Sequence, residues 1–450
     1  MSLQYWLPLI SNTENQGLTG VAVNAYNATT FSDSLFKTGL KFNGSSTYLQ
    51  GTVYTTANMT YMMWLYFDSA TGCHVIDCRD ANGAGYQPMY INPSTGVQVG
   101  GTTSTFPYIP YVFTANIWYH IAVTYSPTKC QLFINGSLVG ENTSAKGTNI
   151  NANQPFYIGS RYTQANWFNG RMNDLRIYDH TCSAKEIAEI AKGLYVHYKL
   201  TDNITITDCS GFKNHGQRTG TLSLNNSSPR YDKSITSSAG AANYIASLES
   251  LSPNCKTVSF WVNMNFNSNQ TVFADKSNYW ALFYYQSKDR FLVGTGAGNE
   301  NHYTFPRTAM IEGWNHIAIV REGTYTKHLF INGEEIDPDT SYSDYYTQNA
   351  GLLNIFRRNY NDAPAATNMS LSDFRIYLTA LSAKSIKELY NESVAIDKNN
   401  NIYSREFVES TTGISIKEAG QLISNSFQED ATNTFFKKTG TVKCKELYEY

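Results

Sequence analysis

The chain has 450 residues, a formal net charge of −2 and 16% charged residues, whereas about 25% is usual for a soluble protein. This low, balanced charge excludes a nucleic-acid partner, which needs concentrated lysine and arginine. No apolar run in the sequence approaches the roughly 20 residues of a membrane-spanning helix, so we also expect no membrane partner. The length suits two or three domains, each with its own core.

The first predicted element is a strand in the opening segment M-S-L-Q-Y-W-L-P-L. This segment has no basic start and no long apolar run, so we do not interpret it as a signal peptide. The seven cysteines contain no CxxC pair and indicate reduced thiols. Cys73 and Cys78 are the two that lie close enough in the sequence for a local pair.

A segment of about twenty residues occurs twice, from Trp118 to Gly136 and from Trp314 to Gly333. Trp-x-His-Ile-Ala opens each copy, and Leu-Phe-Ile-Asn-Gly closes it. Alternate side chains of the opening run would face opposite sides, which predicts a strand. Asn-Gly tolerates the positive φ angles of a type I′ turn, so each copy predicts an antiparallel hairpin.

Each copy continues to a strand motif, D-L-R-I-Y or D-F-R-I-Y, and then to a predicted short helix. Ser183 is a natural N-cap, and Glu186 three residues later completes a capping box. Gly193 is placed as the C-terminal stop. The second copy keeps the cap as Ser382, but Ser385 replaces the glutamate. We predict helices at the ends of two tandem domains.

The repeated segment resembles the laminin-G-like branch of the concanavalin A-like lectin/glucanase jelly rolls. This resemblance covers residues 1–392 and implies an all-β fold. It predicts two tandem concanavalin A-like β-sandwich (jelly-roll) domains, 1–194 and 195–392, each ending in a short helix. It does not identify a ligand, because the superfamily includes lectins, hydrolases and purely structural domains.

The last segment, residues 393–450, contains a repeat of about 20 residues in which Ile402, Leu422 and Val442 are equivalent. Each unit predicts a β-hairpin, and a single hairpin is only marginally stable in water. The hairpins therefore need a covering surface, either the second domain or identical tails of neighbouring subunits. We favour a homo-oligomer, with a trimer as the preferred state, because similar short hairpin repeats are common in phage tail fibres.

Several enzyme motifs are missing from the sequence. The E-x-D-x-x-E pattern of laminarinase-type relatives is absent, and so are H-E-x-x-H and G-x-S-x-G. His120 and His316 lie inside the repeated strands beside tryptophan, with no matched acidic partner, so we interpret them as structural. Trp64 and Trp261 are expected in the core. We predict a protein that is not an enzyme.

The resemblance also implies a possible cofactor, because laminin-G-like domains often hold a calcium ion at the rim of the sandwich. Asp77 and Asp275 occupy equivalent positions after two apolar residues, at expected strand ends. Asp80 adds an oxygen ligand in the first copy. The alternative is that each aspartate caps a turn.

Candidate ligand-binding residues are aromatic side chains expected in or beside loops, where packing does not require a large ring. Stacking of such rings on a pyranose, framed by Asn and Asp, would bind a neutral sugar. The alternative is that each ring packs, since aromatic residues are also good strand formers. The candidates are Trp167, Tyr86 and Tyr108 in the first copy, and Trp280, Tyr303 and Tyr360 in the second.

The opening Y-W-L-P-L with N-Q-G-L-T-G, and D-C-S-G-F-K-N-H-G in the second copy, resemble tail-associated proteins of phages of gut Firmicutes. This resemblance implies a carbohydrate-binding adhesin of the virion, folded in the host cytoplasm. Its partners would be a bacterial surface polysaccharide and other tail proteins. The main alternative is a structural virion protein whose sandwiches bind proteins, and a further one is an unusual glycan hydrolase.

Overall fold

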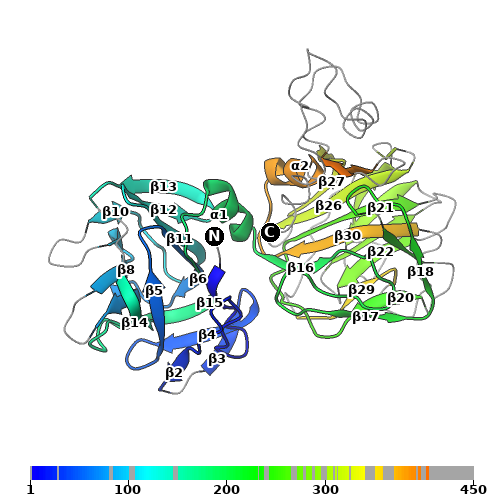
Figure 1. Cartoon of the computed structure of the whole chain (residues 1–450). Helices are drawn as coiled ribbons and strands as arrows, with labels where there is room; N and C mark the ends of the chain where they lie inside the picture. The colour runs from blue at the N-terminus through cyan, green and yellow to red at the C-terminus, as the bar shows by residue number, and fades with distance from the viewer. Residues whose placement is uncertain are drawn as a thin grey trace, which may run out of the picture. The chain divides into compact units, whose positions relative to one another are not determined.

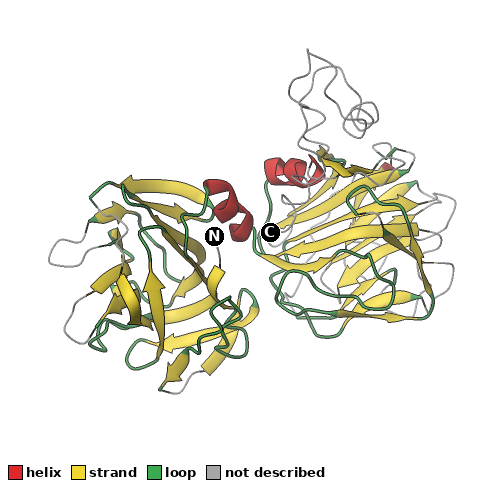
Figure 2. Ribbon diagram, viewed as in Figure 1, coloured by secondary structure: helices red, strands yellow, loops and turns green. Residues whose placement is uncertain are grey.

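The computed structural model contains two compact units, Met1–Gly193 and Leu194–Tyr450 (Figure 1). In both units strands predominate over helices (Figure 2). The backbone is described for residues 3–27, 30–80, 85–100, 107–144, 150–231, 233–237, 243–264, 271–276, 280–285, 289–294, 302–307, 310–311, 313–323, 326–339, 350–357, 369–391, 394–396 and 402–404.

Unit 1 is a sandwich of two antiparallel sheets. Within the described residues, the larger sheet has eight strands and the smaller has seven. In sheet order the larger consists of β13 (Ser137–Asn142), β12 (Cys130–Ile134), β11 (Trp118–Tyr125), β6 (Met59–Phe67), β15 (Asn169–Tyr178), β4 (Lys37–Asn43) and β3 (Thr30–Ser34), with β1 (Leu3–Leu7) also on β15. The smaller consists of β10 (Tyr108–Pro110), β9 (Gly96–Gln98), β8 (Gly85–Asn92), β7 (Cys73–Arg79), β14 (Ile150–Ile158), β5 (Tyr48–Thr55) and β2 (Asn24–Tyr26).

Unit 2 repeats this architecture. Its two sheets, counted over the described part of the chain, again have eight and seven antiparallel strands. The larger consists of β18 (Leu222–Asn225), β19 (Ser234–Ser237), β30 (Met369–Tyr377), β21 (Thr257–Met264), β26 (Trp314–Glu322), β27 (Thr326–Ile331) and β28 (Glu334–Ile336), with β16 (Leu194–Tyr198) on β30. The smaller consists of β17 (Gly216–Thr219), β20 (Tyr244–Ser247), β29 (Leu353–Ile355), β22 (Thr271–Lys276), β23 (Trp280–Tyr285), β24 (Arg290–Gly294) and β25 (His302–Pro306). The predicted fold class is confirmed.

The repeated strand β11 has two different faces, as its alternation predicts. Ile121 and Tyr125 point between the sheets and belong to the main core of unit 1. Ala122 points outward and belongs to a second apolar cluster with Phe133 and Ile187. This second cluster lies on the outer face of the larger sheet, and helix α1 (Ala184–Ala191) covers it with Ile187. Both faces of the larger sheet are therefore buried at its centre.

The Asn-Gly turns have the predicted geometry. Asn135 and Gly136 have φ angles of 50° and 81°, and Asn332 and Gly333 have 53° and 80°, as a type I′ turn requires. The Asn135 side chain also accepts a hydrogen bond from the His120 amide, 2.9 Å away. A Cβ on Gly136 would lie only 3.0 Å from the α1 backbone. Glycine is needed here both for the turn and for close approach of the helix.

The two terminal helices confirm the capping prediction. In α1 the Ser183 hydroxyl accepts from the Glu186 amide, and the Glu186 carboxylate accepts from the Ser183 amide at 2.6 Å. Gly193 follows α1 with a φ of 67°. In α2 (Ala383–Asn391) only the first half of the box remains, where the Ser385 amide donates to Ser382. The helix fold tolerates loss of the glutamate.

A feature that sequence reasoning missed is a bend within the central strand of each larger sheet. Asp174 in β15 and Asp373 in β30 both have a φ of 51°, and the strand register shifts there. The Asp174 carboxylate accepts from Trp6 Nε1 at 2.7 Å and from Arg176 Nε at 2.8 Å. The D-x-R pair thus stabilises a β-bulge, which explains why an aspartate lies inside a buried strand.

In unit 2 the equivalent bulge is more highly charged. The Asp373 carboxylate lies 2.9 Å from both His197 Nε2 and Arg375 Nε, and 3.2 Å from Arg230 Nε. Burial opposes ionisation of Asp373, but the two guanidinium groups outweigh this effect and hold the pKa of its carboxyl below its usual range. A buried carboxylate with this many partners is part of the scaffold of the unit.

Three smaller predictions also have outcomes. The first tail hairpin is present, because β31 (Val394–Ile396) pairs antiparallel with β32 (Ile402–Ser404); the later repeats, 405–450, lie outside the described residues. Cys73 and Cys78 are both free thiols. Among the helices that the structure describes, neither has the length and apolar character needed to span a membrane.

The bulge of unit 2 leads to a stability prediction. Asp373→Asn should lower the free energy of unfolding of unit 2 by about 3–5 kcal/mol, because it leaves two buried guanidinium groups without their counter-charge. Denaturant unfolding of the full chain would measure this loss. Asp289→Asn is the control: Asp289 pairs with Arg307 at an exposed site, where about 1 kcal/mol or less is expected. Equal losses in the two variants would contradict the assignment.

Buried histidines in unit 1 lead to a pH prediction. Burial lowers the pKa of His120 to about 3 and that of His74 to about 4, whereas an unfolded histidine titrates near 6.5. Between pH 6.5 and 4 the unfolded state therefore binds more protons, so acidification destabilises the fold. From pH 7 to 5, residues 1–194, which we expect to fold alone, should lose roughly 2 kcal/mol per histidine. The two histidines together would account for roughly 4 kcal/mol, and His120→Gln should halve this total. An unchanged dependence of unfolding free energy on pH would contradict the prediction.

Candidate functional site

Four aromatic rings gather on the outer face of the smaller sheet of unit 1. We call Tyr26, Tyr48, Tyr157 and Trp167 the aromatic cluster. The Tyr26 and Tyr48 rings stack with centroids 4.6 Å apart. The Tyr48 ring also lies 6.2 Å from Tyr157 and 5.9 Å from Trp167. Tyr48 is thus the buried centre of the group, and Tyr26 is its most exposed member, with 38% of its surface accessible.

Strand alternation explains why these rings face outward. Leu49, between Tyr48 and Gln50 on β5, is fully buried in the core, so its two neighbours point to the opposite face. Register then aligns the rings across the sheet. Tyr26 of β2 lies directly opposite Tyr48, and Tyr157 of β14 lies opposite Gln50. Three strands present their outward side chains in adjoining rows.

The loop between β14 and β15 supplies the fourth ring. Phe168, fully buried in the core, anchors the end of this loop, and the His74 amide donates to the Asn166 carbonyl at 2.9 Å. Gln164 Nε2 donates to the Tyr48 hydroxyl at 3.3 Å. Trp167 is half-buried at this position. The loop is therefore held against the sheet by its own contacts, which orients Trp167 before any ligand arrives.

The same loop contacts a buried ion pair beside the cluster. Both Asp77 oxygens accept from the Arg79 guanidinium, at 2.8 and 2.7 Å, and the Tyr162 amide donates to the same carboxylate at 3.1 Å. The guanidinium groups of Arg79 and Arg161 lie 5.0 and 5.1 Å from the Tyr162 ring centroid. The Arg79 guanidinium therefore offsets the charge of Asp77 within the fold, and the Arg161 guanidinium is a further cation beside the Tyr162 ring.

The surface continues toward the opposite edge of the smaller sheet. His74, Tyr90, Gln98 and Tyr108 lie in one register row across β7, β8, β9 and β10. The His74 and Tyr90 rings are 4.9 Å apart, and Tyr108 at the edge is 42% exposed. Tyr108 is thus the one predicted aromatic residue that the described structure leaves largely open to solvent, although it lies in a strand and not in a loop as predicted.

Asp77, the first predicted calcium ligand, already has a positively charged partner. Asp77 is completely buried and paired with Arg79, so a calcium ion at this carboxylate would have to displace a guanidinium that already supplies positive charge. Asp80 is half-buried nearby. Among the described residues, neither joins two further histidine, cysteine or acidic groups in a metal-sized cluster. The Asp275 backbone lies in β22, and its side chain is outside the described part. Calcium stays a prediction that the Asp77 ion pair opposes.

The remaining predicted aromatics have mixed outcomes. Tyr303 lies in strand β25 and is only 8% exposed, with Lys327 Nζ 5.2 Å from its ring centroid; its prediction as a loop ring was wrong because the strand extends further than the sequence pattern indicated. Tyr86 and Trp280 lie in strands β8 and β23, where only their backbone is described. Tyr360 lies outside the described residues.

Unit 2 does not reproduce the aromatic cluster at the positions that can be compared. Tyr244 corresponds to Tyr48, but its register partner is Thr219 where unit 1 has Tyr26. Asn354 takes the place of Tyr157, judged by its pairing with Asp275. The Arg357 guanidinium also lies 4.6 Å from the Tyr244 ring centroid. The scaffold is shared, and the surface chemistry is not.

The repeated histidines are scaffold residues, as predicted. His120 is fully buried against Trp64, 5.4 Å between ring centroids. His316 lies 5.3 Å from Trp261, and its Nε2 is 2.8 Å from the Ser259 hydroxyl. Each histidine lies on the larger sheet of its own unit, whereas the aromatic cluster lies on the smaller sheet of unit 1.

Comparison with protein families matches two parts of the chain, residues 42–188 and 237–387, to the Laminin_G_3 model of the Concanavalin A-like lectin/glucanases superfamily. The chain belongs to this superfamily. The two matched ranges lie one in each unit, in agreement with the tandem jelly rolls expected from the sequence. No curated protein matches the chain.

Solved structures with similar folds come from several kinds of protein. Domain 4 of AbnA, an extracellular arabinanase from Geobacillus stearothermophilus in complex with arabinotriose, is 15% identical over 42% of this chain and 98% of that domain, with a TM-score of 0.36. The binding domain of Paraclostridial Mosquitocidal Protein 1 is 11% identical over 77% of this chain and 92% of that one, with a TM-score of 0.38. A structure of botulinum neurotoxin type C, whose cell entry depends on two ganglioside molecules, is 14% identical over 83% and 98%, with a TM-score of 0.36.

Proposed function

We propose that the chain is a non-catalytic carbohydrate-binding protein, and that unit 1 holds a neutral glycan on the outer face of its smaller sheet. The aromatic cluster is the observation that carries this proposal. A half-buried Trp167 and an exposed Tyr26 flank the buried Tyr48 ring. Rings fixed in this way lose little conformational freedom when a ligand stacks on them.

The side chains that border the rings directly suit a neutral sugar. The Arg79 guanidinium offsets the charge of Asp77. The residues beside the rings include the side-chain amides of Gln50 and Gln164. Arg161 Nε is buried and makes no hydrogen bond within the described structure. A buried N–H of this kind is one that a water molecule would satisfy.

The biological setting of this binding belongs to the same proposal. We infer a virion adhesin that recognises a host cell-surface polysaccharide, with the C-terminal repeats attaching the chain to other tail proteins. Support comes from the 20-residue repeats of residues 393–450, whose predicted hairpins resemble those of tail fibres, and from the opening segments that resemble phage tail proteins. A structural virion role, in which the same faces bind proteins, is the alternative that the binding experiment addresses.

The direct test is a glycan array probed with the full chain, carrying neutral oligosaccharides and bacterial cell-wall polysaccharides. We expect selective binding to neutral, pyranose-containing structures. Reducing-sugar release from any glycan that binds would be measured in parallel, and we expect none. Binding to no glycan, together with capture by purified tail proteins, would favour the structural role. Release of reducing sugar would overturn the non-catalytic part of the proposal.

Trp167→Ala should weaken glycan binding by about ten- to a hundred-fold, the loss expected on removing a central aromatic contact. Titration calorimetry with a glycan from the array would measure it. Trp118→Ala is the matched control, because Trp118 is also half-buried against a tyrosine, Tyr66, at 5.5 Å, but on the larger sheet. We expect similar small changes in melting temperature in both variants. Binding should be lost in Trp167→Ala alone. Equal loss of binding in both variants would contradict the site.

The tail leads to a separate prediction about assembly. The full chain should be an oligomer, with a trimer expected, and residues 1–392 should be monomeric, because the hairpin repeats need neighbours to cover their apolar side chains. Light scattering of both proteins at equal concentration would show the difference. A monomeric full chain would contradict this role of the tail, while leaving the glycan site untouched.

A further inference from the structure

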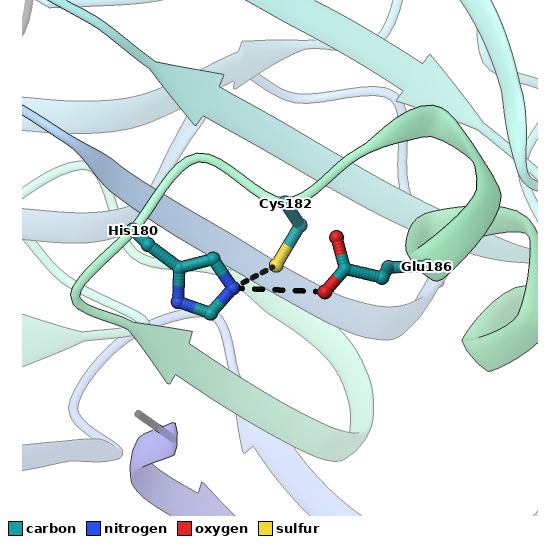
Figure 3. Close-up of side chains that lie close together, drawn as sticks. All are labelled: His180, Cys182 and Glu186. Atoms are coloured by element: carbon teal, nitrogen blue, oxygen red, sulfur yellow. Dashed lines mark hydrogen bonds and ion pairs between the residues drawn. The ribbon is translucent and has the colours of Figure 1, made fainter. Parts of the chain in front are cut away.

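A cluster of three potential metal ligands lies at the C-terminal end of unit 1, around the start of helix α1. His180 and Cys182 precede helix α1, and Glu186 lies in its first turn. Figure 3 shows the three side chains converging on one point. Their ligand atoms all lie within 4.8 Å of one another, and within the described residues no other group of three histidine, cysteine or acidic side chains does so.

The distances between these atoms match those of a zinc site. His180 Nε2 lies 3.6 Å from Cys182 Sγ and 3.8 Å from Glu186 Oε1. Tetrahedral zinc, with bonds of about 2.3 Å to sulfur and about 2.0 Å to nitrogen, would separate the first two atoms by roughly 3.6 Å and nitrogen from oxygen by roughly 3.4 Å. The third pair, Cys182 Sγ and the Glu186 carboxylate oxygen, lies within 4.8 Å, so the carboxylate would move by up to roughly 1.3 Å to complete the geometry. We propose that His180, Cys182 and Glu186 bind a zinc ion.

Each side chain has the orientation that a metal ligand needs. His180 presents Nε2 to the other two groups, while its Nδ1 lies 3.5 Å from the Asp179 carboxylate. His180 Nδ1 makes no hydrogen bond within the described structure, so the Asp179 carboxylate would move closer to become the acidic partner that is usual behind a metal-bound histidine. Glu186 accepts the capping bond from Ser183 with Oε2, so Oε1 remains available on the side facing His180. The helix cap and the metal would use different oxygens of one carboxylate.

The site is accessible from solvent on one side only. Cys182 is 4% exposed, whereas the Glu186 side chain is 35% exposed. Three protein ligands leave a fourth position on the open side, which a water molecule would fill.

The second unit provides an internal comparison. Thr257 of unit 2 corresponds to Thr60 of unit 1. The Thr60 hydroxyl donates to the His180 carbonyl, and the Thr257 hydroxyl donates to the Thr379 carbonyl, both at 2.8 Å. This places Thr379 opposite His180 in the alignment of the two copies. By the same pattern of hydrogen bonds, the Leu381 amide donates to Thr257 as the Cys182 amide donates to Thr60.

All three ligands are thus replaced together in unit 2. Thr379, Leu381 and Ser385 stand where unit 1 has His180, Cys182 and Glu186. The backbone contacts and the helix N-cap are nevertheless preserved, and Leu381 packs in the apolar cluster beneath α2. The fold therefore does not need this triad. In unit 1 Glu186 also caps α1 and Cys182 also packs beneath it, and a shared metal ion would explain why His180 joins them.

The test uses cobalt(II) as a spectroscopic probe on the full chain. We expect one equivalent of cobalt to give a thiolate-to-cobalt charge-transfer band, zinc to displace it, and zinc to raise the melting temperature by mass action. The variant H180T/C182L/E186S, which copies the unit 2 residues and should fold, is expected to lose the band. Asp179→Asn should weaken binding about ten-fold by removing the partner of His180.

Two controls make the result decisive. Cys209→Ser removes the exposed free thiol of the described chain and should leave the cobalt band and its stoichiometry unchanged. If the triple variant fails to fold, His180→Thr alone gives the same readout at a partly exposed position. A wild-type chain without the band, a band that persists in the folded triple variant or in His180→Thr, or a band that disappears in Cys209→Ser, would each overturn the zinc site.

Discussion

The burial of the outer face of the larger sheet by a short helix is the constraint on which each unit depends. A sandwich has two outer faces, and the repeated strand carries apolar groups on its outward side, including Ala122 in unit 1 and Ala318 in unit 2. Without a cover these groups would face water. Helices α1 and α2 supply the cover and sit directly on the Asn-Gly turns, where a side chain would collide with them. The smaller sheet is then the one whose outer face can present rings to a ligand.

Comparison of the two units distinguishes scaffold contacts, which they share, from surface residues, which differ. Both units keep the Asn-Gly turn, the N-capped helix, the threonine that ties the helix entry to the sheet, and the aspartate bulge in the central strand. What differs lies on this scaffold. The bulge partner is Trp6 in unit 1 and His197 in unit 2, and the tyrosine stack and the histidine-cysteine-glutamate cluster belong to unit 1. Contacts that hold the sandwich together are shared, and contacts that would meet a ligand are not.

The ion pair of Asp77 illustrates how charge and function interact in this fold. The position is equivalent in both copies and follows two apolar residues, which predicts a strand end and favours a metal when the sequence is considered alone. In the structure Asp77 instead lies within β7. In the folded unit, Arg79 from the same strand occupies both oxygens, and the loop amide of Tyr162 adds a third bond. The carboxylate therefore fixes the loop that carries Trp167. Asp77 would therefore contribute to a ligand site by positioning the Trp167 ring, since Arg79 offsets its charge.

Local rules account for what the sequence determined by itself. The alternation of β11, the Asn135-Gly136 turn and the Ser183-Glu186 capping box each involve residues a few positions apart, so their physics is complete within a short segment. The family and the two-domain fold follow from their repetition. The aromatic cluster was decided by tertiary structure alone. Tyr26, Tyr48 and Tyr157 look like ordinary strand residues, and Trp167 was recognised only as a single loop ring, because the register of three distant strands and the anchoring of one loop bring them together. The proposed zinc site also depends partly on tertiary structure. Its residues are close in sequence, but only the turn into α1 points His180, Cys182 and Glu186 at one another.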